Sequence, residues 1–318
     1  MKSLSALLLG LVLLTGPAAA QLTDMEPDDR AAMAAAVDAA EAGERAGLPP
    51  AEQAQLWLDA ANTALNGREL VGTAGRRAAQ RHVERAERIL DRAGIDAPLM
   101  RGRIALAHAN YWRWRERFER ARDFADDGIA LLETGGADRR ELADAYYAAG
   151  FITYRALDVP GAGRRFRAAL DLYQELLPVL HHRRLRTNGW TTMTEALAER
   201  IAAADRQLFV MVANAPPADT ELGERHGGDW AVTEAPGFDT TAWHGRLDGF
   251  AVILLDVDAQ GVPTNIRLEE TYPGDLWDRE ILHGLTAWRL DPDALADPDA
   301  RTTDIALTFI YGVQRYHR

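Results

Sequence analysis

The first two thirds of the chain carry a helical pattern of small and apolar positions. From Pro27 to about Asn214 the sequence is rich in Ala, Arg, Glu and Leu, with sparse Gly and Pro between helix-length segments. Three trios recur there with spacings of four and then three: Ala79-Val83-Ala86, Ala121-Ala125-Gly128 and Ala162-Phe166-Ala169. These spacings put each trio on one helical face, where its small members let a neighbouring helix approach closely. The pattern predicts stacked helix pairs, with each trio on the second helix of its pair.

The pattern changes after residue 214. Residues 215–237 carry Pro, Gly and acidic residues with little periodicity, which predicts a linker. From Phe238 onward, Val, Ile, Thr and aromatic residues alternate in short runs, which is typical of strands. We therefore expect an α+β protein with several domains, in which an all-helical array of residues 21–214 precedes a small domain of residues 238–318.

The C-terminal domain is predicted to run strand, strand, helix, strand. Residues 249–257 form an apolar run that ends in a turn with Asp258 and Gly261, and residues 262–270 supply the partner strand. Residues 275–288 form an amphipathic helix that carries one apolar stripe. The stripe contains Trp277, Ile281, Leu285 and Trp288. Residues 304–313 form the last strand, with Ile305, Leu307, Phe309 and Tyr311 on one face.

The helical half resembles tetratricopeptide repeats. That family places small residues at the eighth, twentieth and twenty-seventh positions of a helix pair and an aromatic residue at the twenty-fourth. Gly150, Ala162, Phe166 and Ala169 fall on those four positions. Ala109, Ala121 and Gly128 fall on three of them in the preceding unit, so the offset is 150 − 109 = 41 residues rather than about 34. A longer turn around residues 135–138 accounts for the difference, and a generic helical bundle is the alternative.

Residues 238–313 resemble the C-terminal domain of the TonB energy-transducer family. The family pattern has a Gly that opens an alternating strand, an Asp-x-x-Gly turn, a second strand bearing an arginine and a helix that ends Trp-Arg-apolar-x-Pro. The corresponding elements here are Gly249, Asp258 with Gly261, Ile266-Arg267-Leu268 leading to Glu270-Thr271, Gly274, Trp288-Arg289-Leu290-Asp291-Pro292 and Ile305-Ala306-Leu307-Thr308-Phe309.

The resemblance implies a binding role in the periplasm. TonB-type domains pair, through an exposed sheet edge, with a short extended segment of an outer-membrane transporter. An unpaired row of backbone N–H and C=O groups on an edge strand recruits such a segment. The last strand is the candidate edge, because it is apolar and free of proline and no later strand covers it. The expected partner-binding residues are Ile305, Ala306, Leu307, Thr308, Phe309, Ile310 and Tyr311.

Residues 1–20 predict a secretory signal peptide, cleaved after Ala20. They hold one positive charge, a short apolar run from Leu4 to Leu14 and an Ala-x-Ala ending. The expected location is the periplasm, and inner-membrane anchoring follows only if the leader is retained. A motor-coupled TonB needs such an anchor and a long Pro-rich spacer, and a helical domain stands here instead. The alternative function is therefore a periplasmic helical-repeat scaffold or adaptor without energy transduction.

The amino-acid composition excludes several kinds of catalytic and metal-binding site. Lys2, Ser3 and Ser5 are the only lysine and serines, and there is no cysteine, so the mature chain lacks Lys, Ser and Cys. This excludes Ser or Cys nucleophiles, lysine Schiff bases and thiolate metal sites. Without Lys2 the formal charge is 35 − 48 = −13, which disfavours nucleic acid. We expect a non-enzymatic protein without a cofactor, although a paired-carboxylate hydrolase is the least excluded enzyme.

Three further motifs have weaker functional interpretations. Residues 111–118 interleave aromatic residues with arginines, which favours an amphipathic helix over nucleic-acid binding; the same arginines could clamp an acidic peptide. His181 and His182 are adjacent on a predicted helix and point apart, so they do not form a metal site by themselves. The loop with Asp291, Asp293, Asp297 and Asp299 lacks the residue order of a calcium loop and is expected to be solvated.

Overall fold

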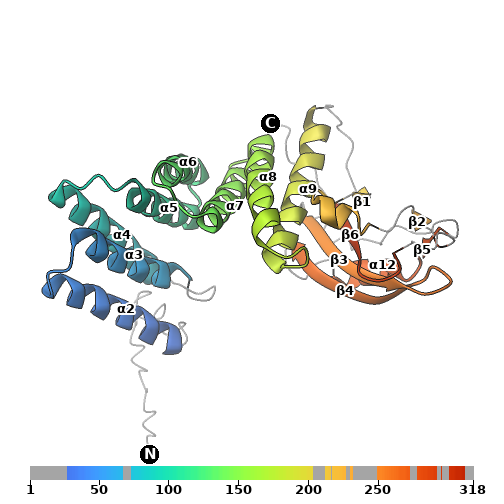
Figure 1. Ribbon diagram of the computed structural model, residues 1–318, viewed down its shortest axis with the longest axis horizontal. Helices are drawn as coiled ribbons and strands as arrows, with labels where there is room; N and C mark the ends of the chain where they lie inside the picture. Colours follow the sequence, from blue (N-terminus) through green and yellow to red (C-terminus); the bar gives the residue numbers. More distant parts are fainter. Residues whose placement is uncertain are drawn as a thin grey trace, which may run out of the picture. The chain divides into compact units, whose positions relative to one another are not determined.

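The computed structural model of the chain describes residues 27–66, 73–202, 212–215, 217–226, 230–231, 249–272, 278–291, 295 and 301–311. Helices occupy the N-terminal part, and an antiparallel sheet lies in the C-terminal part (Figure 1), which confirms the predicted order of the two kinds of structure. Contacts divide the chain into two compact units within helix α6 (Phe118–Thr134). The first unit contains Met1–Arg117 and Ala130–Gly135, and the second contains Phe118–Ile129 and Gly136–Arg318.

The first unit contains α2 (Pro27–Arg45), α3 (Pro50–Asn66), α4 (Thr73–Ala93) and α5 (Pro98–Trp114). Its core is built mainly from alanines, with Trp57 and Leu90 as large buried members. The predicted trio Ala79, Val83 and Ala86 is fully buried in that core. Small residues at these positions allow the short distance between helix axes that close packing requires.

A polar cluster joins α2, α3 and α4 beside Trp57. The Trp57 Nε1–H donates to Glu44 Oε1 at 2.7 Å, and the Arg85 Nε–H donates to the same oxygen at 2.8 Å. The Arg85 guanidinium also lies over the Trp57 ring, 4.1 Å from its centroid. The hydrogen bond from Arg85, followed by the bond from Trp57 and the charge of Arg85, lowers the pKa of Glu44 against the opposing effect of burial.

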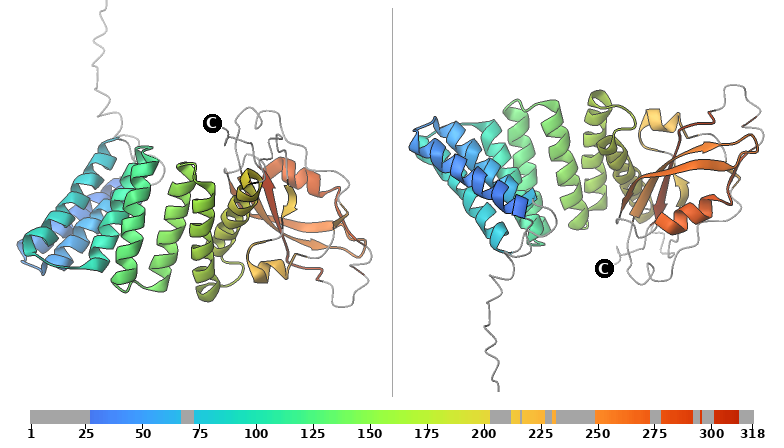
Figure 2. Two further views of the ribbon diagram at one scale, coloured as in Figure 1. Left: turned by 90° about the horizontal axis from the view of Figure 1, so that it is seen from above. Right: turned by 90° about the horizontal axis from the view of Figure 1, so that it is seen from below.

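The second unit contains the helix pair α7 (Arg139–Arg155) and α8 (Val159–Leu176), followed by α9 (His182–Ala202). The side chains of Asp138 and Asp158 cap the first two by accepting the N–H groups of Glu141 and Gly161, each at 2.8 Å. Both views of Figure 2 show α7, α8 and α9 side by side. A Cβ atom on Gly150 would lie 2.8 Å from the Phe166 ring, so glycine permits the close contact of α7 with α8.

Two helix pairs share the same spacing along the chain. Helices α5 and α7 begin 139 − 98 = 41 residues apart, and α6 and α8 begin 159 − 118 = 41 residues apart. The turns inside the two pairs contain Glu116 (φ 56°) and Leu157 (φ 67°), which are again 41 residues apart. The trios on α6 and α8 are buried, as the spacing predicts.

The sheet has the strand order β1-β6-β3-β4 and its paired neighbours are antiparallel. Its strands are β1 (Val212–Ala215), β3 (Gly249–Val257), β4 (Pro263–Tyr272) and β6 (Ile305–Tyr311). Helix α10 (Thr220–Gly223) follows β1, and α12 (Asp278–Leu285) follows β4. A separate ribbon pairs β2 (Trp230–Ala231) with β5 (Arg289–Leu290). The β3–β4 turn has the predicted chemistry: Asp258 Oδ1 accepts two backbone N–H groups, and Gly261 has φ 75°.

Both faces of the central strands β3 and β6 are buried. On one face, Ala251, Ile253, Leu307 and other residues of β3 and β6 pack with Ile281 and Leu285 of α12 and with Trp288. On the opposite face, Phe250, Val252, Leu254, Ala306 and Ile310 pack against Leu185, Trp190 and Met193 of α9, and through them against α8. The strands separate α12 from α9 (Figure 2). The sheet and helices α7 to α9 therefore share one continuous core.

This arrangement differs from the expected separation of the helical array from a domain that begins at residue 238. Within the segment expected to be a linker, residues 215–237, Ala215 lies in β1 while Asp219 and Leu222 are buried. The described part of that segment is thus attached to both α9 and the sheet. Trp277, expected on the stripe of α12, lies outside the described residues.

Candidate interaction site at the edge of the sheet

The last strand was expected to be a free edge, and its position in the sheet shows that this prediction is wrong. Strand β6 is internal, because it pairs with β3 on one side and with β1 on the other. This correction applies to Ile305, Ala306, Leu307, Thr308, Phe309, Ile310 and Tyr311. The physical reason is that an earlier segment of the same chain, β1, supplies the covering strand. The prediction had considered only strands that follow β6 in sequence.

Two separate pieces of backbone cover the β6 edge. Strand β1 pairs with it in the register Val212↔Ile310 and Ala215↔Thr308, with an irregularity between those two pairs. The Ala306 N–H donates to the carbonyl oxygen of Arg225 at 2.8 Å, in the turn after α10. Since N–H groups alternate in direction along a strand, those of Ala306, Thr308 and Ile310 all point toward this side of β6. The β6 edge, defined by these three residues, is therefore occupied by main-chain groups of the chain itself.

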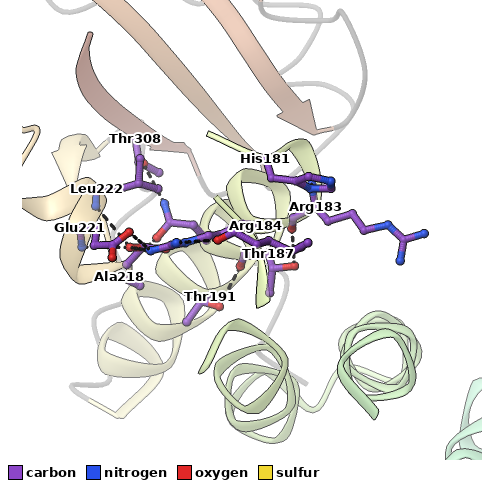
Figure 3. A network of polar contacts seen from close by, with 12 residues as sticks. His181, Arg183, Arg184, Thr187, Thr191, Ala218, Glu221, Leu222 and Thr308 are labelled. Carbon is purple, nitrogen blue, oxygen red and sulfur yellow. Dashed lines mark hydrogen bonds and ion pairs between the residues drawn. The ribbon is translucent and has the colours of Figure 1, made fainter. Parts of the chain in front are cut away.

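A buried ion pair anchors the segment just after β1 to α9. Arg184 on α9 is 2% exposed and Asp219 is 0% exposed. The Arg184 Nε–H donates to Asp219 Oδ2 at 2.5 Å, and its Nη2–H donates to Asp219 Oδ1 at 2.9 Å. Further bonds run from Nη2 to Glu221 and from Nη1 to the Leu177 carbonyl. Figure 3 shows Arg184 reaching from α9 toward Glu221 and Ala218.

The same network fixes the beginning of α10. Asp219 is its N-cap, and Asp219 Oδ1 accepts the N–H groups of Glu221 and Leu222. Burial acts to lower the pKa of Arg184, but the hydrogen bond and charge of Asp219 outweigh it, so that this pKa is raised. A buried pair of opposite charges is stable only if its remaining hydrogen-bond donors and acceptors also have partners. The arrangement meets that condition and holds α10 in one place.

Asn188 connects the anchor with β6. Its Oδ1 accepts the Asp219 N–H at 2.7 Å, and its Nδ2–H donates to Thr308 Oγ1 at 3.4 Å. Thr308 is fully buried, and Figure 3 shows its side chain beside this network. The next residue on α9, Gly189, touches β3: a Cβ atom there would lie 2.3 Å from the Phe250 ring. Helix α9 thus positions both β6 and the segment that leads away from β1.

Strand β4 is the outer strand on the opposite side of the sheet. It pairs with β3, with irregularities between Val252 and Ile253 and between Leu254 and Asp256. Its Arg267 forms ion pairs with Glu269 and Asp304, and its buried Glu270 accepts from Arg186 of α9 at 2.9 Å. Tyr147 lies near this pair, and burial raises the pKa of its hydroxyl to about 12. Bulges and paired charges are features that oppose strand addition, so β4 is a poor docking edge although it is an outer strand.

The remaining candidate residues that the structure describes are not brought together into a metal site. His181 and His182 were expected to point apart on one helix, and this prediction is wrong: His181 precedes α9, and the two rings stack with centroids 4.4 Å apart. Arg113 donates to Asn110 and lies over Trp114 rather than lining a shared basic surface with Arg115, which is exposed. Among the described residues, no group of three or more His, Asp or Glu side chains has the arrangement of a metal site. Asp293, Asp297 and Asp299 lie outside the described residues.

None of the helices in the described ranges combines the length and the apolar character needed to cross a membrane. The predicted leader, residues 1–20, lies outside those ranges.

Sequence reasoning missed Arg184, Asn188 and Asp219. Arg184 sits in the polar run His181-His182-Arg183-Arg184, and Asp219 sits in a segment rich in Pro and acidic residues, so neither shows a signal of burial. A capping signal was present, because Asp219 stands directly before Thr220-Glu221-Leu222 and Asp is a preferred N-cap residue. The pairing of this aspartate with an arginine 35 positions earlier is a tertiary contact.

Comparison with protein-family models and with curated proteins gave no match to this chain.

Proposed function

We propose that the chain is an exported, non-enzymatic protein of the periplasm that binds other proteins, with a TonB-like sheet joined to tetratricopeptide-like helix pairs. The sheet pairs with an extended segment of an outer-membrane partner, and a TonB-dependent transporter is the partner class that the sequence resemblance favours. The protein acts by contact, with neither a metal nor a cofactor.

The pairing of β1 with the β6 edge is the observation that carries this proposal. Here the described residues 212–215 add to the sheet by antiparallel main-chain pairing, which is the mode of contact expected for the partner segment. The edge also carries buried side chains, because Ala306, Thr308 and Ile310 face α9. An added strand therefore contacts a fixed surface.

A second candidate function is an adaptor or scaffold without energy transduction, and the shared core favours it. Helix α9 covers the face of the sheet opposite α12, so the sheet forms the end of a helical array. A sheet fused in this way to helices that can contact a second protein is suited to an adaptor. The recurrence of the helix pairs at a constant spacing supports a repeat array, although this spacing is 41 residues rather than the tetratricopeptide period of about 34.

Two measurements test the proposed function. Sequencing the N-terminus of the mature protein from fractionated cells should give Gln21 as the first residue in the periplasmic fraction. Retention of the leader in the inner membrane would instead favour coupling to a membrane motor.

The second measurement is affinity purification of the tagged full chain from solubilised envelopes. It should recover an outer-membrane protein that a synthetic peptide of its own extended periplasmic segment displaces. Recovery that such peptides leave unchanged would contradict strand pairing.

A further inference from the structure

We propose that β1 covers the β6 edge reversibly. It leaves this edge when an extended partner segment binds there. This inference rests on the proposed function, since it describes how the same edge is kept closed between binding events. The partner segment that fits is a short extended segment that pairs antiparallel with β6, as β1 does now.

The covering of the β6 edge is short compared with the pairing on its other side. Between β6 and β3 the register runs without interruption from Gly249↔Tyr311 to Leu255↔Ile305. Strand β1 contributes four residues, and its register with β6 shifts between Val212 and Ala215. Ala306 is covered by the Arg225 carbonyl instead. Among the described residues, opening of β1 therefore breaks fewer main-chain bonds than opening of the β3–β6 ladder and leaves that ladder intact, which is the condition for local rather than global opening.

The anchor after β1 makes its release reversible. Ala215 lies 219 − 215 = 4 residues before Asp219, which is held by Arg184 and Asn188 in the buried network. Release of β1 does not require this network to break. A segment tethered so closely stays at a high effective concentration near the edge, so it rebinds whenever the edge is empty. The anchor thus sets the affinity that a partner segment needs in order to displace β1 from the edge.

Amide exchange, resolved residue by residue by NMR on the full chain, tests the exchangeable state without a partner. The N–H groups of Thr308 and Ile310 should exchange on the order of 100-fold faster than those of Leu307 and Phe309, which point toward β3. Equal protection of all four amides would overturn the proposal, because β1 would then open only with the whole sheet.

A disulfide lock tests whether release of β1 is required for binding. The natural chain lacks cysteine, so the register pair Ala215 and Thr308 can be joined in the variant Ala215→Cys/Thr308→Cys. The probe is a labelled synthetic peptide of residues 210–216, VMVANAP. The reduced variant should bind this peptide at least about tenfold more tightly than the oxidised variant, since β1 can leave the β6 edge only when the disulfide is reduced.

The matched control is Ala251→Cys/Thr271→Cys, which joins β3 to β4 at a register pair and leaves β1 free. Oxidation of this control should leave peptide binding unchanged. Equal binding to the oxidised and reduced β1–β6 variant, or no binding to either, would overturn the proposal. If the exchange and peptide results hold while no outer-membrane protein is recovered, the exchangeable strand stands and the proposed partner fails.

Discussion

At the residue scale, loss of the buried Arg184 side chain should strongly destabilise the second unit. Replacing it in Arg184→Gln leaves Asp219 buried without its cation, and such a break costs about 3–5 kcal/mol of unfolding free energy. Urea denaturation followed by circular dichroism measures the loss.

Arg183→Gln is the matched control, because Arg183 lies on the same helix and pairs with Asp144 at a partly exposed site. Its cost should stay below about 1 kcal/mol. Equal losses in the two variants would show that burial of the Arg184–Asp219 pair does not matter.

Glu44 gives the first unit a pH-dependent contribution to stability. Its pKa is lowered in the folded chain by the hydrogen bond from Arg85, so the unfolded chain takes up this proton first as the pH falls. The contribution is therefore complete above the ordinary value of 4.5 and is lost as the pH falls through the folded pKa.

Unfolding in urea at pH 7 and at pH 3.5 should show a smaller drop in stability for Glu44→Gln than for the natural chain. An identical pH dependence in both proteins would contradict this account.

The sequence predicts the burial of apolar residues with a helical period better than the burial of polar residues. Ala162, Phe166 and Ala169 follow a helical period and lie fully buried on α8. Arg184 and Asp219 follow no period, because their burial depends on each other and on Asn188 rather than on neighbours in sequence. A pattern of apolar positions contains no information about such a pair.

At the element scale, the contact of α9 with β3 depends on Gly189. Gly189→Ala would place a Cβ atom 2.3 Å from the Phe250 ring. Overpacking of this kind costs about 1–3 kcal/mol, and thermal unfolding of the variant measures it.

A double variant with Phe250→Leu, compared with Phe250→Leu alone, should show a smaller cost for Gly189→Ala. The control is Gly223→Ala, whose added Cβ has its nearest neighbour at 3.9 Å and should be tolerated. Equal costs at positions 189 and 223 would refute the close contact.

The strands could be predicted from sequence, whereas their surroundings were only partly predicted. Alternation and turn residues indicated β3, β4 and β6 to within a few residues of their observed bounds. The run Phe250-Ala-Val-Ile-Leu-Leu255 is apolar at every position, and such a run is typical of a strand buried on both faces. The cover that α9 provides on one of these faces was not predicted. Strand β1 was missed, since Val212–Ala215 is too short to give a period.

At the scale of the whole molecule, the shared core predicts which fragments fold. Residues 238–318 alone would lack β1 and would expose the face formed by Phe250, Val252, Leu254, Ala306 and Ile310. A fragment of residues 136–318 keeps α7 to α9 and covers that face.

We expect a cooperative thermal transition by circular dichroism for the longer fragment and none for the shorter one. A cooperative transition in residues 238–318 at a similar temperature would mean that the helices are not part of the folding unit.

The central claim is that this protein binds an extended partner segment at the β6 edge, and photo-cross-linking in cells tests it most directly. A benzophenone amino acid replaces Thr303, which is exposed just before β6, and in the control it replaces Thr264, which is exposed on β4. The account predicts that Thr303, and not Thr264, cross-links to an extended segment of an outer-membrane protein, with lower yield in the oxidised β1–β6 variant. Equal cross-linking at both positions, or cross-linking that oxidation leaves unchanged, would contradict it.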